Sequence, residues 1–378
     1  MPPVKQPLPS FEPSQVTAFR LSRQHLLDTE TADLSTVVED ACGIQAQVQS
    51  AAEIALWARL HHITLAQIRA ALWQSRTLAK TSAMRGTLHL FTSADLPVYI
   101  SALKANRLEV LYSHIRRNYG IRREDDDRAF AAVVDALGAT PTTRRELVER
   151  LVPSLGEGLR EHIERPWGVV RRAVVEGFAL YGPDRGPEST FVRADQWLPE
   201  MVDVPEDEAR QTLFRRYLGA YGPATLRDFS KWSGLAVREI RGIPRALGSD
   251  LVELSVADTT AYLMRDDLDD LASSHLDSPA LRLLGNFDPY LLAHADTGQY
   301  LEPAHYKRVY RKAGWISPVV LLDGHVTGVW SQTRRGKRLV IAIEPFEKLS
   351  KAVQTLIEAE ATSLATFLHA TSEVTFSP

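Results

Sequence analysis

The sequence is almost free of cysteine. Cys42 is the only one in 378 residues, so no disulfide can form within the chain and nothing indicates an oxidising compartment. Because Cys42 lies close to Gln45, a nucleophilic thiol is an alternative to consider. No local feature is of the kind that lowers the pKa of a thiol, so a small buried side chain is the simpler interpretation.

Long apolar runs and a strong net charge are also missing. No segment approaches the ~20 apolar residues of a membrane-spanning helix, and the proline-rich start of the chain has no apolar signal segment. We therefore expect a cytoplasmic protein with no membrane partner. The formal net charge of -3 gives no overall attraction to nucleic acid, so any DNA binding must depend on local basic patches.

The length of 378 residues predicts two to four packed units. Helical periodicity followed by strand alternation, the order of a winged helix-turn-helix, occurs three times along the chain. We expect an α+β fold of three tandem winged helix-turn-helix motifs, followed by a β-rich portion and a closing helix. The expected boundaries are an extension over 1–13, winged-helix units over 14–124, 125–200 and 201–278, and the C-terminal portion over 279–378.

The first unit should begin with helices over 14–27, 51–60 and 64–78. The period then changes, because residues 84–92 alternate as in a strand, with Arg85, Thr87 and His89 on one face. These three residues are candidate supports of a site. His89 could orient a glutamine or bind a phosphate, whereas a histidine in a strand more commonly bonds to nearby backbone.

The second and third units repeat this order. The third helix of the second unit, expected over 167–177, carries Arg171 and Arg172, which are candidate DNA contacts. The other elements expected in these two units are helices over 127–137, 144–152, 224–232 and 236–247, a helix ending at 221, and strands over 178–181, 190–193, 251–256 and 260–264, with a candidate wing over 182–187.

The C-terminal portion reads mainly as strand, over 281–284, 315–322, 325–330 and 339–344, before a helix over 347–369. Asp323-Gly324 predicts a tight hairpin turn, and residues 331–338 read as a compact basic loop. The candidate phosphate contacts are His325 in the hairpin and Arg334, Arg335, Lys337 and Arg338 in the loop. The alternatives are that the hairpin tip only connects strands and the loop only aids solubility.

A polar-apolar alternation over 43–49 precedes the second helix. In an extended segment, Gln45 and Gln47 would project to the same side and form one amide-lined spot. Two amides can fix a water molecule in position without carrying charge. The alternative is that these side chains cap or bridge backbone groups at the start of the helix.

Several motifs in this order resemble the AlkZ-type family of winged-helix DNA glycosylases: Gln45-Ala46-Gln47, Met84–His89, Tyr217–Pro223, Phe287–Leu292 and Val319–Trp330. The resemblance implies three winged-helix motifs around a concave DNA-binding surface. It implies hydrolysis of the N-glycosidic bond of N7-alkylated guanines, including the unhooking of interstrand crosslinks made by natural products such as azinomycin B. It also implies that Gln45 and Gln47 occupy a catalytic Gln-X-Gln motif.

The chemistry of this lesion agrees with a site made of amides. N7-alkylguanine is cationic and leaves as a neutral base, so it needs no general acid, and the protein's task is to place water at C1′. No lysine is placed for Schiff-base chemistry, so we expect a monofunctional glycosylase that leaves an intact abasic site. Asp288 is a candidate stabiliser of the cationic sugar, with turn capping before Pro289 as the alternative.

The histidines and acidic clusters lack the spacing of metal ligands, so we expect no metal and no cofactor. The expected partner is double-stranded DNA that contains alkylated or crosslinked guanine, bound by a monomer. The alternative function is a non-catalytic winged-helix regulator or an adduct-binding protein. A regulator would normally read a symmetric site as a dimer, which three divergent units in one chain fit poorly.

Overall fold

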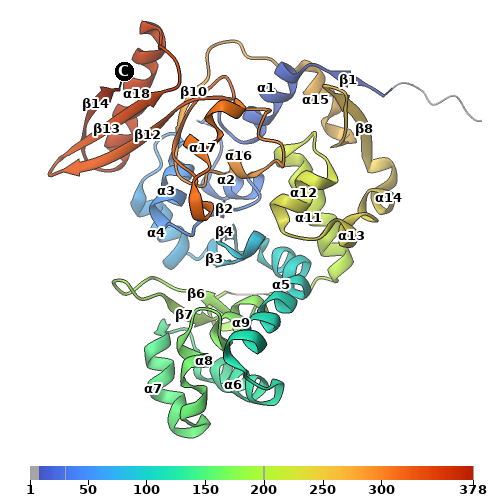
Figure 1. The fold of residues 1–378 in the computed structure, drawn as a ribbon, viewed down its shortest axis with the longest axis vertical. Coiled ribbons are helices and arrows are strands. Elements are labelled where there is room, and N and C mark those ends of the chain that lie inside the picture. Colours follow the sequence, from blue (N-terminus) through green and yellow to red (C-terminus); the bar gives the residue numbers. More distant parts are fainter. Residues whose placement is uncertain (1–7, 30, 199–200, 378) are drawn as a thin grey trace, which may run out of the picture. The chain divides into compact units, whose positions relative to one another are not determined.

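The computed structural model describes residues 8–29, 31–198 and 201–377 (Figure 1). Contacts divide the chain into a terminal unit, made of Met1–Ile68 and Phe214–Pro378, and a central unit, made of Arg69–Leu213. The mixture of helices and sheets confirms the expected α+β class. Residues 1–7 of the expected N-terminal extension lie outside the described residues. Among the described residues, no helix is both long and apolar enough to cross a membrane.

The central unit contains antiparallel strands in the order β4-β3-β6-β7-β5. The strands are β3 (Leu78–Ser82), β4 (Leu88–Thr92), β5 (Thr142–Thr143), β6 (Ala179–Tyr181) and β7 (Thr190–Arg193). The helices are α5 (Leu96–Tyr119), α6 (Arg123–Ala136), α7 (Arg144–Leu155), α8 (Arg160–Glu164), α9 (Val169–Val175) and α10 (Ala194–Trp197). The chain enters this unit within α4 (Leu65–Trp73) and leaves it within α11 (Glu206–Tyr221).

From α6 to β7 the elements follow the order that the sequence predicts for the second unit. Helix α7 begins with a capping box, since the Thr143 hydroxyl accepts from the Glu146 N–H at 3.2 Å and the Glu146 carboxylate accepts from the Thr143 N–H at 2.7 Å. One apolar core, which includes Val133, Leu147 and Val170, joins α6, α7 and α9. This core fixes the face of α9 that carries Arg171 and Arg172.

Two predictions for the chain before α5 are wrong. The helix expected over 64–78 ends at Trp73, and strand β3 begins at Leu78. The strand expected over 84–92 begins only at Leu88, because residues 84–86 form a tight helical turn with φ of 54° at Arg85 and 79° at Gly86. A positive φ interrupts an extended backbone, so Arg85, Thr87 and His89 do not lie together on one face of a strand.

The terminal unit contains two sheets. In the smaller, β1 (Ser10–Phe11) pairs parallel with β8 (Leu251–Val256), which pairs with β9 (Thr259–Met264). The larger has the order β10-β11-β12-β13-β14, with bounds Leu281–Leu284, Val319–Leu322, His325–Arg335, Arg338–Pro345 and Thr371–Phe376. The helices are α1 (Pro13–Arg23), α2 (Leu34–Asp40), α3 (Gln49–Trp57), α12 (Leu226–Ser233), α13 (Val237–Ile240), α14 (Ile243–Leu247), α15 (Leu268–Ser273), α16 (Pro289–Leu292), α17 (Tyr306–Val309) and α18 (Lys351–Phe367), while the two-residue strand β2 (Ile44–Gln45) joins α2 to α3.

The larger sheet corrects one further prediction. Residues 331–338 are not a loop, because β12 and β13 continue to a two-residue turn at Gly336 and Lys337, with Arg335 opposite Arg338. Strand β14 then pairs parallel with β13, which supports the hairpin from its other edge. Helix α18 packs on this sheet (Figure 1). The basic residues of the hairpin therefore stand on a defined scaffold.

The tight turn between β11 and β12 is confirmed. Asp323 and Gly324 have φ of 51° and 79°, and Leu322 lies opposite His325. A Cβ atom on Gly324 would lie 2.2 Å from Cγ2 of Thr17 in α1, so the turn requires glycine both for its φ and for this close approach. The hydroxyl of Tyr290 also donates to the Gly324 carbonyl at 2.9 Å. The tip is thus packed against the protein.

Candidate active site and DNA-binding surfaces

The stretch with the two glutamines is held by the end of α2. The Gly43 N–H donates to the Val38 carbonyl and the Cys42 N–H to the Glu39 carbonyl, both at 2.9 Å. Cys42 and Gly43 have positive φ, which ends the helix and turns the chain into β2. Cys42 is buried, as the simpler interpretation of this residue expects.

The two glutamines differ in exposure. Gln45 lies on β2 and is 6% exposed, between Ile44 and Ala46, which are fully buried. Gln47 is exposed and lies in a bend before α3, whose N-cap is Val48. Strand β2 therefore ends at Gln45, and neither glutamine is the N-cap of the helix. A projection of both amides toward one spot stays a prediction.

A tyrosine of the motif Tyr217–Pro223 supports this stretch, which the sequence did not reveal. The buried hydroxyl of Tyr221 donates to the carbonyl of Ala41 at 2.6 Å, at the point where α2 ends. Tyr217, one helical turn earlier, donates to the carbonyl of Ala293 at 2.9 Å. The spacing of four residues on α11 was the available signal, since it places both rings on one face.

Asp288 lies inside the protein. Its carboxylate is fully buried and accepts from both terminal nitrogens of Arg59, at 2.7 and 2.8 Å. It also accepts from the Tyr290 N–H at 3.0 Å and so caps α16, which is the alternative role expected for it. Arg59 follows α3, so the pair ties the end of that helix to the motif Phe287–Leu292. We therefore treat Asp288 as a structural residue.

The candidate supports in the central unit surround the turn at residues 84–86. The Thr87 hydroxyl donates to the Met84 carbonyl at 3.1 Å and closes this turn. His89 is 2% exposed, and its Nδ1 lies 3.1 Å from the Thr87 carbonyl oxygen, which is the backbone partner expected as the alternative. Burial, with the charges of Arg85 and Arg107 beside it, lowers the pKa of His89 to about 3. The ring is therefore neutral and carries no charge for a phosphate.

Arg171 and Arg172 have different surroundings although they are adjacent on α9. Arg172 is 5% exposed and pairs with Asp126, Asp127 and Glu176, each at 2.7 Å. The pairs with Asp126 and Asp127 hold α9 to α6. We therefore do not assign Arg172 to a DNA contact. Arg171 is half-buried, and its Nη2 donates to the Gly86 carbonyl at 2.8 Å.

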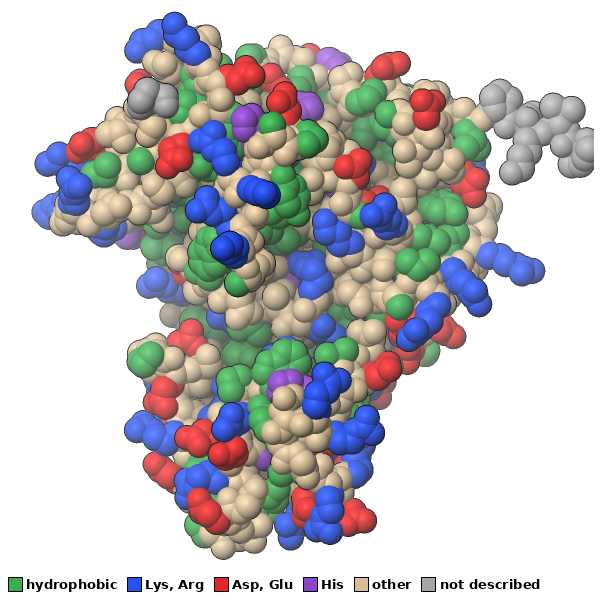
Figure 2. Space-filling view, in the orientation of Figure 1, with side chains coloured by type: hydrophobic (Ala, Val, Ile, Leu, Met, Phe, Trp, Pro, Cys, Tyr) green, Lys and Arg blue, Asp and Glu red, His purple; other side chains and the backbone are tan. Residues whose placement is uncertain are grey.

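The basic turn, which we define as Arg334–Arg338, is exposed in the terminal unit, and Figure 2 shows Lys and Arg side chains gathered at this end of the hairpin. Arg334 donates to the carbonyls of Leu368 and His369 at 2.9 and 3.0 Å, and Arg338 pairs with Glu373 at 2.6 Å. Within the described residues, no carboxylate pairs with Arg335 or Lys337. His325 is exposed too, at the start of β12.

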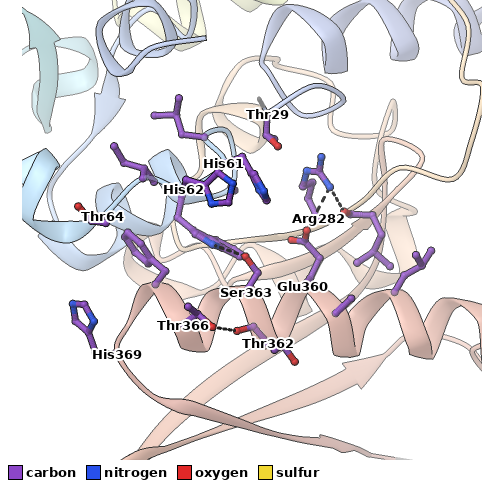
Figure 3. A pocket seen from close by; sticks show the side chains of 18 of the residues that line it. Thr29, His61, His62, Thr64, Arg282, Glu360, Thr362, Ser363, Thr366 and His369 are labelled. Atoms are coloured by element: carbon purple, nitrogen blue, oxygen red, sulfur yellow. Dashed lines mark hydrogen bonds and ion pairs between the residues drawn. The ribbon is translucent and has the colours of Figure 1, made fainter. Parts of the chain in front are cut away.

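The cavity in Figure 3 is separate from these residues. It measures about 840 Å³ and lies in the terminal unit among the loop after α3, β10 and α18. His61 and His62 face Glu360 and Arg282 across it, and burial raises the pKa of Glu360. None of the candidate residues lines this cavity. Among the described residues, no group of three or more His, Cys, Asp and Glu could hold a metal ion.

Comparison with known proteins relates this arrangement to DNA repair enzymes. The sequence model of the family described as "DNA glycosylase AlkZ-like" matches residues 38–367. An interstrand DNA cross-link repair glycosylase from Streptomyces sahachiroi is 34% identical over 359 residues, which cover 93% of this chain and 95% of that protein. The solved structure of the DNA glycosylase AlkZ from the same organism has a TM-score of 0.84 and 31% identity, and the match covers 97% of this chain and 100% of that one.

Proposed function

Because this chain belongs to the AlkZ-like family of DNA glycosylases, we propose that it hydrolyses the N-glycosidic bond of N7-alkylguanine in double-stranded DNA. The proposed substrates include interstrand crosslinks, as the name of the relative from Streptomyces sahachiroi favours. Bifunctional, azinomycin-like agents are the proposed source of these crosslinks. The observation that carries the proposal is the pair Gln45 and Gln47, near the start of the region that matches the family. The proposed enzyme acts as a monomer.

In this proposal the two amides position the attacking water. Gln45 is buried on β2, so its neighbours restrict its rotation, while Gln47 reaches solvent where a sugar can approach. The carbonyl oxygen of an amide accepts a hydrogen bond from water, and its N–H groups can be held by the protein. Fixing water near C1′ lowers the entropy cost of the attack without any need for a strong base.

The proposed reaction is a hydrolysis with a cationic leaving group. Water forms a bond to C1′ as the bond from C1′ to N9 breaks, and the electrons of that bond neutralise the purine. The water loses one proton to solvent, and the products are a neutral N7-alkylguanine and an intact abasic site. No residue has to protonate the base, because the alkyl group has already placed the positive charge on it.

We propose that the duplex is held in an open cleft formed by three tandem winged-helix motifs. A guanine tethered to both strands cannot easily be flipped into a closed pocket, which many glycosylases use. The exposed side chains of His325, Arg335 and Lys337 are the proposed phosphate contacts of the terminal unit. Gly324 is not one of the proposed phosphate contacts, because the turn that contains it packs on Thr17.

The test is excision from a duplex that carries one N7-alkylguanine, read as strand breaks after treatment with base. Gln45→Ala and Gln47→Ala should each slow excision by ~100-fold or more, because the water is no longer placed. Gln49→Ala, in the first turn of α3, is the matched control and should stay close to wild type. Excision by both variants at the wild-type rate would remove the proposed mechanism. A sequence-specific footprint without any excision would favour the regulator instead.

A further inference from the structure

An arginine cluster in the central unit lacks acidic partners. Arg107 on α5, Arg144 at the start of α7 and Arg171 on α9 are each half-buried. Among the described residues, no carboxylate forms an ion pair with any of the three. The chain has 47 acidic residues, and other arginines, such as Arg59, Arg172 and Arg338, do have such partners. The cluster is therefore a local excess of positive charge.

Two members of the cluster bind the same turn, at residues 83–86. The Arg107 Nη2 donates to the Ala83 carbonyl at 2.5 Å and would lie 2.6 Å from a Cβ atom on Gly86. The Arg171 Nη2 donates to the Gly86 carbonyl at 2.8 Å, while its guanidinium lies 4.3 Å from the centre of the Trp167 ring. The absence of a side chain at Gly86 thus leaves room for the Arg107 guanidinium, and Arg171 reaches the same turn from a second helix.

The electrostatics agree with an uncompensated cluster. Burial lowers the pKa of Arg107 to about 10, and the charges of Arg171 and Arg85 contribute to this shift. Burial also lowers the pKa of Arg171, and the charge of Arg144 acts in the same direction. The Nε atom of Arg144 is buried without a hydrogen-bond partner in the described structure. Like charges held this close are stabilised by an anion that binds from outside the chain.

We propose that Arg107 and Arg171 together bind one phosphodiester group of the DNA backbone at the Gly86 turn, with Arg144 beside them. The planar fork of a guanidinium matches the geometry of phosphate oxygens, and two forks can surround one phosphate. This inference rests on the proposed function for the presence of DNA, and it adds Arg107 to the residues that bind the substrate. The phosphate would be the anionic partner of Arg171, whereas the neighbouring Arg172 already pairs with carboxylates of the protein.

The test measures binding of undamaged duplex DNA over a series of salt concentrations. Arg107→Gln with Arg171→Gln should weaken binding and reduce the slope of log K against log salt by about one, the value for one lost phosphate contact. Arg145→Gln is the matched control, since Arg145 neighbours Arg144 on α7 and is paired with Glu188 at 3.2 Å. It should leave the slope unchanged. An unchanged slope in the double variant would overturn the proposal.

Two further measurements distinguish a DNA phosphodiester site from a misfolded variant and from a site for free phosphate. If the double variant does not fold, Arg107→Lys retains the charge and should weaken binding with little change in slope; wild-type affinity in that variant would overturn the proposal. A rise in melting temperature with inorganic phosphate over chloride at equal ionic strength, lost in the double variant while the DNA slope is unchanged, would assign the site to free phosphate instead. Because the duplex is undamaged, a failure of wild-type excision would count against the proposed function and not against this site.

Discussion

The basic turn and the arginine cluster are both rich in cationic side chains, but they differ in where the opposite charge lies. In the basic turn, Arg334 and Arg338 are occupied by carbonyls and by Glu373, and the side chains are well exposed. In the arginine cluster, Arg107 and Arg171 are half-buried, and each donates to a backbone carbonyl without a carboxylate partner among the described residues. A cation that is partly buried loses hydration and is less well screened than an exposed one. We therefore expect an anion to bind more favourably at the cluster than at the basic turn. Partial burial without a counter-charge, rather than the density of arginine, identifies the stronger candidate.

The largest expected effect concerns an arginine whose counter-charge is fully internal. Asp288→Asn would leave the buried Arg59 without its carboxylate, and we expect a loss of ~3–5 kcal/mol in the free energy of unfolding, measured with urea. Arg338→Gln, which breaks an exposed pair, is the comparison and should cost ~0–1 kcal/mol. Similar losses in both variants would contradict the distinction between internal and surface pairs.

A smaller effect is expected at Gly86, in the turn that both guanidinium groups bind. Gly86→Ala adds a Cβ atom 2.6 Å from the Arg107 Nη2 at a φ of 79°. We expect ~1–3 kcal/mol of destabilisation from the strained backbone, together with weaker binding of duplex DNA. Gly336→Ala, in the basic turn, also has a positive φ but meets no neighbouring atom within 4 Å. If the two variants lower DNA affinity equally, the close approach at Gly86 has no part in binding.

The exposed cations of the basic turn should contribute through salt-dependent attraction alone. Arg335→Gln with Lys337→Gln should lower the slope of log K against log salt by up to about two, with no loss of stability. Arg334→Gln with Arg338→Gln should lower it less, because the protein already engages those groups. Equal slopes for the two double variants would show that internal partners do not matter at this turn.

Stability should fall in acid partly because of His89. The pKa of His89 is lowered to about 3 by burial and by the nearby arginines, so folding favours the neutral ring. Its contribution is therefore complete above the unfolded pKa of ~6.5 and is lost progressively as the pH falls from there toward about 3. His294, whose pKa is lowered to about 4 by burial, acts in the same direction. His89→Phe should make the unfolding free energy less dependent on pH in this range, and an unchanged dependence would contradict the assignment.

Regular apolar patterns predicted much of the fold. Strands β7, β8 and β10 have the bounds that the sequence indicates, because each has several buried apolar residues between clear turns. Strand β3 was missed because Lys80, Thr81 and Ser82 are polar and yet buried. The sequence indicates a loop for the outer half of the β12–β13 hairpin, because its residues are charged and exposed. The hairpin is supported by the pairing of β13 with β14, which lies more than thirty residues later in the chain.

The site was predictable only where its residues are close in sequence. The pair Gln45 and Gln47 is visible as a motif, whereas Arg107 reaches Gly86 only through the packing of α5. Helix α5 itself was missed, since its buried residues are concentrated in its first half. Arg171 and Arg172 look equivalent in the sequence because the carboxylates that distinguish them lie on α6 and at the C-terminal end of α9.

The measurement that bears most directly on catalysis by paired amides is the pH dependence of the single-turnover excision rate on duplex N7-alkylguanine. Neither Gln45 nor Gln47 titrates, so the wild-type rate should be nearly flat from about pH 6 to about pH 9. With the measurement extended to lower pH, Gln47→Asp should introduce a rate that falls below about pH 5, as its carboxylate becomes protonated. A steep limb with an apparent pKa in the wild-type enzyme would contradict water placement by uncharged amides and would require a titrating catalytic group.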